Sequence, residues 1–455
     1  MAERIVVAFE GEGSGVGELT WGQRQIWQAM QDTGTSQSMG AVVPLDGKTV
    51  ADLAAELRFF MCRYESMRTR LRFDAEGRPW QEVSRSGEIA MEVFDADDDG
   101  DPAEVAEALA LRWEETNFDY VNEWPMRMGV VRHRGVATHV VVMLCHLAAD
   151  GAGVAVMMDE LAQRDPATGQ AHTPVTAMQP RELALQQRTP AGQRQSDTAM
   201  RYWERMLRTM TPRRFGDCVD RREPRFWQVG FDSPAMYLAV QAIAARTTGD
   251  ASPVLLAAFA VALARVTGNN PVVTQAIISN RFRPGLAEVV SPVNENGLYV
   301  VDVADCTFDE AVERARRASM TGSKYAYYDP AQLDELIARV GRERGEPIDL
   351  GCVFNDRRIA ARQDPAGPPA SREQVEAALA HSTLVWQRPL PSFNERLMVS
   401  VNDVPDTVDI LAEVDTHHLS PAALEVFLRG MEAVVVEAAF DPAASTRVAS
   451  TLAVV

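Results

Sequence analysis

Residues 138–161 constrain the fold of this chain more than any other stretch. They begin with the apolar run Val140–Leu144, which is unbroken and rich in β-branched residues. A short run of this kind is typical of a strand that is buried on both faces. The run ends at Cys145 and His146, and a helical pattern follows from Ala152 to Leu161. The sequence therefore predicts a buried strand that carries a histidine at its end and leads into a helix.

The polar residues after this strand favour chemistry over packing. A neutral imidazole at His146 can accept a proton from an amine or a hydroxyl at cellular pH. Asp150 lies four residues later, where its carboxylate is better placed to pair with an arginine than to react. Gly151 is expected to adopt backbone angles that a Cβ would forbid. The alternative is a core histidine that hydrogen-bonds a nearby carbonyl, and the richer local pattern favours a functional His146.

The segment CHLAADG, residues 145–151, resembles the His-His-x-x-x-Asp-Gly motif of the condensation-domain superfamily. That superfamily includes the condensation domains of nonribosomal peptide synthetases and chloramphenicol acetyltransferase-like enzymes. The resemblance assigns the catalytic role to the second histidine of the motif, which is His146 here. Cys145 stands where the family usually has its first histidine, so the geometry of this loop is expected to differ. Weaker matches follow in the family's order from Leu19 to about Ala439.

The resemblance implies an α/β (α+β) fold of two chloramphenicol-acetyltransferase-like lobes. The lobes are expected to form a V-shaped pseudo-dimer with a central tunnel. The N-terminal lobe, with the His-x-x-x-Asp-Gly motif, is predicted over residues 1–170, and the C-terminal lobe over residues 196–455. Residues 171–195 are predicted to be a linker, because periodicity fails there and Pro, Gln, Thr and Ala predominate.

The resemblance also suggests further residues of the site. The family pairs its motif aspartate with an arginine, which implies that Asp150 pairs with Arg281. Asn294 or Asn296 could occupy the position of a family asparagine, and Tyr328 could hydrogen-bond a substrate at the mouth of the tunnel. Ordinary packing is the alternative for Tyr328.

These features predict a stand-alone condensation-type acyltransferase of natural-product biosynthesis. It would move an acyl or aminoacyl group from a carrier-protein phosphopantetheine thioester to a small-molecule amine or alcohol. The pantetheine arm belongs to the donor, so no cofactor is expected on the enzyme itself.

One alternative is a non-catalytic condensation-like protein that binds an acyl- or peptidyl-carrier protein or recruits another enzyme. Another is a coenzyme A-dependent small-molecule acyltransferase. A covalent mechanism at Cys145 is disfavoured, because adjacent residues leaving a strand point to opposite sides.

Charge and composition exclude several other classes of function. The net charge of −19 argues against nucleic acid and against anionic membranes as partners. No apolar run approaches the roughly 18 residues of a membrane span, and no signal peptide is evident. We therefore expect a cytoplasmic monomer. Residues 201–225 are an exception to the acidic balance, because they are dense in arginine. We interpret this segment either as a solvated helix face followed by a loop or as a docking patch for an acidic partner.

Cysteine and histidine spacing predicts no metal site. None of the five cysteines shows CxxC spacing, which indicates neither a disulfide framework nor a zinc site. His417 and His418 have no carboxylate or thiolate at ligand spacing beside them. Free, buried thiols are the simpler interpretation of the cysteines.

Local patterns predict the remaining structure. Residues 10–18 are expected to be mobile, Arg68 is expected to form a buried ion pair, and residues 360–370 are expected to be a loop. Clear apolar periodicity and end signals predict helices, at Val50–Tyr64, Ser233–Arg246, Ser252–Val266 and a C-terminal helix after Ser420.

Overall fold

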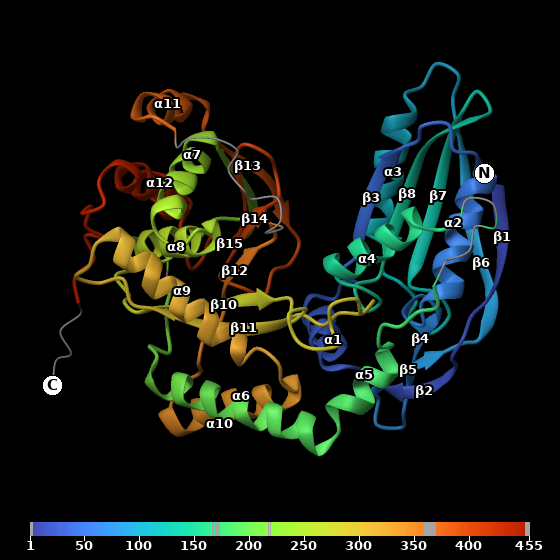
Figure 1. The fold of residues 1–455 in the computed structure, drawn as a ribbon, viewed down its shortest axis with the longest axis horizontal. Coiled ribbons are helices and arrows are strands. Elements are labelled where there is room, and N and C mark those ends of the chain that lie inside the picture. Colours follow the sequence, from blue (N-terminus) through green and yellow to red (C-terminus); the bar gives the residue numbers. More distant parts are fainter. Residues whose placement is uncertain are drawn as a thin grey trace. The chain divides into compact units, whose positions relative to one another are not determined.

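The computed structural model describes residues 3–165, 168, 173–216, 218, 220–358 and 370–450. The chain divides into two compact units. Unit 1 contains Met1–Ser196 and Ser279–Glu295, and unit 2 contains Asp197–Ile278 and Asn296–Val455. Each unit has its own β-sheet with helices packed on it (Figure 1). The predicted mixed α/β fold is therefore confirmed.

Unit 1 contains a five-stranded sheet in the order β1-β6-β7-β8-β3 and a three-stranded sheet in the order β2-β5-β4. In the larger sheet β6 and β7 are parallel, whereas β7 and β8 form an antiparallel hairpin around Gly135, which has a φ of 79°. The strands of unit 1 are β1 (Glu3–Glu10), β2 (Gly15–Glu18), β3 (Met39–Pro44), β4 (Thr69–Phe73), β5 (Pro79–Val83), β6 (Ser86–Ala96), β7 (Met126–His133) and β8 (Val136–Leu144).

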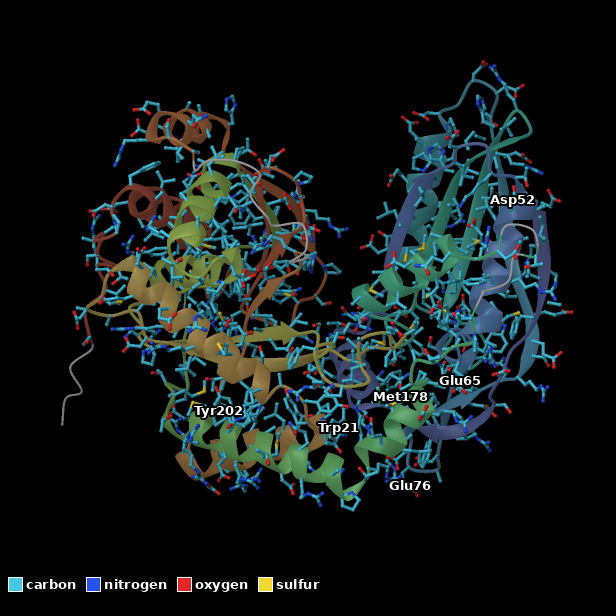
Figure 2. All side chains as sticks on the ribbon, viewed as in Figure 1. Trp21, Asp52, Glu65, Glu76, Met178 and Tyr202 are labelled. Atoms are coloured by element: carbon cyan, nitrogen blue, oxygen red, sulfur yellow. The ribbon has the colours of Figure 1, made fainter. Side chains whose placement is uncertain are left out.

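The helices of unit 1 begin at well-formed caps. Thr20 and Gln23 form a capping box at the start of α1, and Thr49 and Asp52 form one at the start of α2, where Figure 2 labels Asp52. Each box satisfies backbone N–H groups that a helix otherwise leaves unpaired. The helices are α1 (Trp21–Thr33), α2 (Val50–Arg63), α3 (Pro102–Glu114), α4 (Gly151–Ala162) and α5 (Pro180–Gln187).

The strand predicted over Val140–Leu144 lies within β8. This strand is flanked by β7 and β3, so its backbone hydrogen-bonding groups are paired on both edges. Val141 and Leu144 are buried. Directly after the loop that follows β8, the chain enters α4, which confirms the predicted strand-to-helix arrangement.

Unit 2 contains a seven-stranded sheet in the order β11-β10-β12-β14-β15-β9-β13. The pairs β10–β12 and β12–β14 are parallel, and the pairs from β14 to β13 are antiparallel. The strands are β9 (Phe226–Ser233), β10 (Val272–Ile278), β11 (Glu295–Val301), β12 (Cys352–Asp356), β13 (Thr383–Leu390), β14 (Leu397–Asn402) and β15 (Val408–Asp415).

The helices of unit 2 enclose its main hydrophobic core. The helix after Ala251 is apolar on nearly every side, and its residues from Val254 to Ala264 are all buried, as the sequence predicts. Tyr202, labelled in Figure 2, and Trp203 are buried in a smaller cluster. The helices are α6 (Pro190–Thr209), which crosses the boundary between the units, α7 (Pro234–Arg246), α8 (Ala251–Thr267), α9 (Phe308–Lys324), α10 (Pro330–Arg344), α11 (Arg372–Ala378) and α12 (Pro421–Phe440).

Two local predictions near the N-terminus are wrong. The segment expected to be mobile, residues 10–18, contains β2, which pairs with β5. Arg68 is fully buried, but its guanidinium donates hydrogen bonds to backbone carbonyls and not to a carboxylate. The acceptors are the carbonyl oxygens of Glu12, of Gly13 at 3.1 Å and of Ser84 at 2.6 Å. The guanidinium of Arg68 therefore fixes the backbone between β1 and β2 through hydrogen bonds to its carbonyl groups.

The predicted linker is partly helical. Residues 171–195 contain α5 and the beginning of α6, whereas residues 171 and 172 lie outside the described residues. Of the predicted loop at 360–370, residues 360–369 also lie outside them. The boundary between the units is also more complex than the predicted division, because residues 279–295 belong to unit 1.

Within the described residues, no single helix has the length and apolar composition needed to cross a membrane. Among the described residues, α7 and α8 together have the required length and apolar composition, but the chain bends by 116° between them.

Candidate active site

His146 lies in unit 1, two residues beyond the end of β8, with its side chain half-buried. Its Nδ1 atom is 2.9 Å from the carbonyl oxygen of Ala149. A carbonyl oxygen can only accept a hydrogen bond, so Nδ1 must carry the proton. In the neutral imidazole the lone pair is then on Nε2. The loop therefore selects the tautomer in which Nε2 can accept a proton.

Asp150 is buried and uses both carboxylate oxygens for structure. It is the N-cap of α4, where Oδ1 accepts the backbone N–H of Gly153 at 2.7 Å. The same oxygen is 2.5 Å from Nη2 of Arg281, and Oδ2 accepts the N–H of Val293 at 3.2 Å. With these three donors, Asp150 fixes the start of α4 and does not act on His146.

Arg281 is the partner that the sequence analysis nominated for Asp150, and the ion pair is present within unit 1. The exposed fractions of the two side chains are only 12% for Arg281 and 9% for Asp150. Nη1 of Arg281 also donates to the carbonyl oxygens of Val289, at 2.8 Å, and Ala287, at 3.1 Å. The guanidinium of Arg281 thus links residues 281–293 to the N-cap of α4. Arginine suits this position because its planar guanidinium can donate several hydrogen bonds at once.

The side chain of Cys145 is buried in an apolar cluster. It is 2% exposed and lies in an apolar cluster with residues of α1, α3 and β8. Burial raises the pKa of its thiol to about 12, so the thiolate needed for a nucleophile is not formed at neutral pH. Beside Cys145 and Ser66 is a cavity of about 30 Å³, which has room for about one water molecule. Burial and the raised pKa of its thiol therefore argue against Cys145 as the nucleophile.

The conformational role expected of Gly151 is wrong. Gly151 is the first residue of α4 and is absent from the described glycines with positive φ, and a Cβ on it would meet open space. The restricted glycine is Gly153, where a Cβ would lie 3.2 Å from Oδ1 of Asp150 and 3.4 Å from Nη2 of Arg281. The need for a small residue therefore comes from the ion pair.

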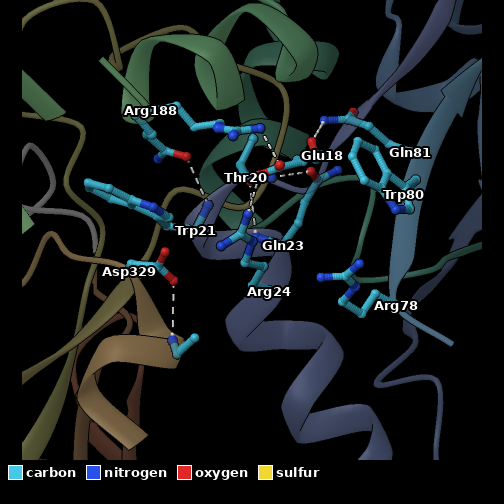
Figure 3. Close-up of polar contacts among 12 residues, drawn as sticks. Glu18, Thr20, Trp21, Gln23, Arg24, Arg78, Trp80, Gln81, Arg188 and Asp329 are labelled. Carbon is cyan, nitrogen blue, oxygen red and sulfur yellow. Dashed lines mark hydrogen bonds and ion pairs between the residues drawn. The ribbon is translucent and has the colours of Figure 1, made fainter. Parts of the chain in front are cut away.

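Gln23 is a positioning residue that the sequence analysis missed. Its Oε1 accepts the N–H of Thr20 at 2.9 Å, and its Nε2 donates to the carbonyl oxygen of Leu147 at 3.3 Å. The side chain thus connects the first turn of α1 to the residue after His146. Figure 3 shows Thr20 and Gln23 of this capping box. The N–H of Trp21 donates to Oε1 of Gln187 at 2.9 Å. The signal in the sequence was the Thr-x-x-Gln spacing, which marks a capping box.

The three predicted tunnel residues have different environments. Asn294 is part-buried, and its Oδ1 has no hydrogen-bond partner among the described residues. Tyr328 is 2% exposed, and its hydroxyl donates to the carbonyl oxygen of Asn296 at 2.7 Å. The ring of Tyr328 also packs edge-on against Trp203 at 5.9 Å. Tyr328 is therefore a packing residue, as its alternative interpretation held.

The adjacent histidines His417 and His418, from which no metal site was predicted, make other contacts. Nε2 of His417 is 3.0 Å from the carbonyl oxygen of Arg222. Across the part of the chain that the structure describes, no three histidine, cysteine or carboxylate side chains converge as metal ligands.

The model of the family described as Condensation domain matches residues 15–367. The chain belongs to the condensation-domain family. This match contains His146, Asp150 and Arg281, and therefore the whole hydrogen-bonded loop described above.

Known relatives agree with this assignment. The nonribosomal peptide synthetase kk1B of Curvularia clavata is 27% identical over 282 residues, which are 59% of this chain and 2% of the relative. The condensation domain from the Monacolin K polyketide synthase MokA has a TM-score of 0.72 at 16% identity, covering 96% of this chain and 100% of that one. The X-domain from teicoplanin biosynthesis has a TM-score of 0.71 at 19% identity, covering 96% and 97%. The two structures establish the shared fold. The chain spans at most 10% of the length of the curated relatives it matches.

Tyr64 is the C-cap residue of α2 and contacts the helix that follows the His146 loop. Its ring is buried, its hydroxyl donates to Glu160 of α4, and burial raises the pKa of that hydroxyl. Arg63 pairs with the same carboxylate. Tyr64 therefore connects α2 to α4, the helix that follows the His146 loop.

Proposed function

We propose that this condensation domain transfers an acyl or aminoacyl group from a carrier-protein phosphopantetheine thioester to an amine or hydroxyl acceptor. The observation that carries the proposal is the hydrogen bond between Nδ1 of His146 and the carbonyl of Ala149, which leaves Nε2 as the acceptor of a proton. Membership of the condensation-domain family supports the reaction class.

In the proposed reaction, Nε2 of His146 accepts a hydrogen bond from the N–H or O–H of the acceptor. The acceptor attacks the thioester carbonyl as its proton moves toward Nε2. The tetrahedral intermediate then collapses, the carbon–sulfur bond breaks, and the pantetheine sulfur leaves with the proton that His146 returns. Amide or ester and a free thiol are the products. The pantetheine arm enters with the donor, so the domain needs no cofactor of its own.

The chain's own residues would hold His146 in place during this step. Gln23 fixes the carbonyl of Leu147, and Asp150 fixes the first turn of α4, so both ends of the loop are bound. A positioned base of this kind typically contributes 10²–10⁴-fold to the rate. Stand-alone action, a tunnel that receives donor and acceptor, a monomeric state and a cytoplasmic location stay predictions.

The test is acyl transfer by the 455-residue chain with a separately purified, acyl-loaded carrier protein and a panel of amine and alcohol acceptors. Parallel reactions with the matching acyl-coenzyme A distinguish the carrier-dependent reaction from a coenzyme A-dependent one. We expect product from the carrier-bound donor. Product from acyl-coenzyme A alone would contradict the proposed donor and leave the role of His146 standing.

A second candidate function is binding without turnover. It is favoured by Cys145, which departs from the family motif at the residue next to His146. The X-domain of teicoplanin biosynthesis, which has a TM-score of 0.69 with this chain, was solved in complex with OxyB. On this candidate, our chain would bind a carrier protein or another enzyme through the same fold. A stable complex with a loaded carrier, with no product from any acceptor, would favour it over acyl transfer.

A further inference from the structure

The arginine-dense segment, residues 201–225, contains one arginine unlike its neighbours. Arg208, Arg222 and Arg225 are paired with carboxylates, those of Glu204 and Glu343, Asp220 and Asp415 respectively. Arg214 is only 6% exposed, and no carboxylate among the described residues forms an ion pair with it. The segment is therefore not a uniform solvated face, because it places one guanidinium inside unit 2.

The guanidinium of Arg214 is anchored on one side and unpaired on the other. Nη1 donates to the carbonyl oxygen of Val273 at 3.2 Å. Nε and Nη2 are buried without a hydrogen-bond partner among the described residues. These two atoms form the edge of the fork that binds a carboxylate or a phosphate with two parallel hydrogen bonds. Burial also lowers the pKa of Arg214, which reflects the cost of holding this charge away from water.

Arg214 lines a cavity of about 840 Å³ that lies wholly within unit 2. Arg396 and His418 line the same cavity and are already partnered by carboxylates: Nε of Arg396 is 3.6 Å from Oδ2 of Asp349, and Nε2 of His418 is 3.8 Å from Oδ2 of Asp415. Native proteins rarely leave buried polar groups unpaired, and an uncompensated buried cation is especially unfavourable. Arg214 is therefore the lining residue whose guanidinium has two unused donors.

The position of these side chains follows from the sheet. Arg396 lies directly before β14, and residues 347–351 lie directly before β12, its parallel neighbour. His418 follows the end of β15, which is antiparallel to β14. All three segments thus meet at one edge of the seven-stranded sheet of Figure 1. Backbone bonds hold that edge, including one from the N–H of Arg396 to Gly351 at 2.6 Å.

We propose that this cavity binds a small organic anion through a carboxylate or phosphate group seated on Nε and Nη2 of Arg214, with Arg396 and His418 in the same lining. The apolar lining residues Phe215 and Ile348 would contact the body of the ligand. Asp349 also lines the cavity, and its Oδ1 accepts the N–H of Gly351 at 2.9 Å. Oδ2 of Asp349 is 3.6 Å from Nε of Arg396, and Glu395 also lines the cavity. Since two carboxylates line it, the cavity suits a ligand with a single anionic group and not a polyanion. The site is independent of the proposed acyl transfer at His146.

The test uses three probes with one ring and different head groups: benzoate, phenyl phosphate and the neutral benzamide. Each is titrated into the full chain at constant ionic strength while the melting temperature is recorded. We expect a saturable rise in melting temperature with benzoate, phenyl phosphate or both, and none with benzamide. Response to one anion alone assigns the ligand class as carboxylate or phosphate.

Two variants locate the binding. Arg214→Gln removes the fork and should raise the apparent Kd at least about tenfold, in line with the loss of charge-assisted hydrogen bonds. Arg208→Gln removes a charge from the same segment but outside the cavity, and should leave the Kd within about twofold. Equal affinity in wild type and Arg214→Gln, or no response beyond that to benzamide, would overturn the proposal.

A structure of the wild-type protein soaked with the responding probe gives a reading that does not depend on the stability of a variant. We expect its anionic group within hydrogen-bond distance of Nε and Nη2 of Arg214. Density for the probe only at other places on the protein would also overturn the proposal.

Discussion

The ion pair between Asp150 and Arg281 should be strongly coupled to the stability of unit 1. Both side chains are nearly buried, so removing either one leaves a charge without its partner in a low-dielectric site. We expect Asp150→Asn and Arg281→Met each to lower the free energy of unfolding by about 3–5 kcal/mol. Asp150→Ala should cost about 1 kcal/mol more than Asp150→Asn, because alanine also loses the cap to Gly153.

The double variant Asp150→Asn/Arg281→Met removes both charges at once. Its cost should therefore be smaller than the sum of the two single costs by about 2–3 kcal/mol. The assay is equilibrium urea unfolding, with hydrogen exchange of peptides from α4 and residues 280–293 to locate the loss. A matched control is Asp95 and Arg132, a pair of unit 1 in which the aspartate is 65% exposed. That pair should show much weaker coupling.

Additive single and double variants, within about 0.5 kcal/mol, would refute this reasoning. So would unchanged hydrogen exchange at the start of α4. Either result would mean that the carbonyl contacts of Arg281 with Val289 and Ala287 stabilise the guanidinium without Asp150.

Three further predictions concern other positions. Cys145→Ala should keep the rate of acyl transfer within about threefold of wild type and lower the free energy of unfolding by about 1 kcal/mol, because the buried thiol is protonated and contributes only packing. A loss of rate as large as that of a His146 variant would restore the hypothesis that Cys145 is the nucleophile. Burial, followed by the charge of Arg396, lowers the pKa of His418 below 6.5 in the folded protein, so folding favours the neutral ring. The stability that this neutral ring contributes should therefore be lost as the pH falls from about 6.5 through the lower pKa of the folded state. The slope should be at most about 1.4 kcal/mol per pH unit and should flatten in His418→Gln; an identical slope in that variant would contradict it. Gly22→Ala would place a Cβ 2.3 Å from the carbonyl oxygen of Pro292, so thermal unfolding should show a loss of about 1–3 kcal/mol; an unchanged melting temperature would show that the loop yields freely.

Much of the fold could be predicted because burial leaves a clear pattern. The helix α8 and the strand β8 are apolar over their whole buried length, so their patterns identify them. The strand β1 could not be identified so easily. Its inward residues Val7 and Phe9 alternate with Val6, which is apolar but 60% exposed, and the resulting continuous apolar run hides the two-residue period.

The site was predicted as far as local spacing and family resemblance extend. Asp150 and Arg281 are 131 residues apart, and only the resemblance brought them together. The hydrogen bond from Gln23 to Leu147 crosses 124 residues, and no local pattern predicts it. In the same way, the sequence places Arg214 in an arginine-dense segment, but only the tertiary structure shows that it is the buried one.

The account rests most on Nε2 of His146 as the group that accepts the acceptor's proton. The direct test is the single-turnover rate of acyl transfer from a loaded carrier protein by wild type, His146→Ala and His139→Ala. His139 lies on β8, the strand that leads to the His146 loop, and its Nδ1 is 3.2 Å from the hydroxyl of Thr138. Its variant therefore controls for the loss of an imidazole close to His146 in the chain. We predict a 10²–10⁴-fold loss in His146→Ala and a rate within about threefold of wild type in His139→Ala. Equal rates for wild type and His146→Ala, with the fold intact, would contradict the account.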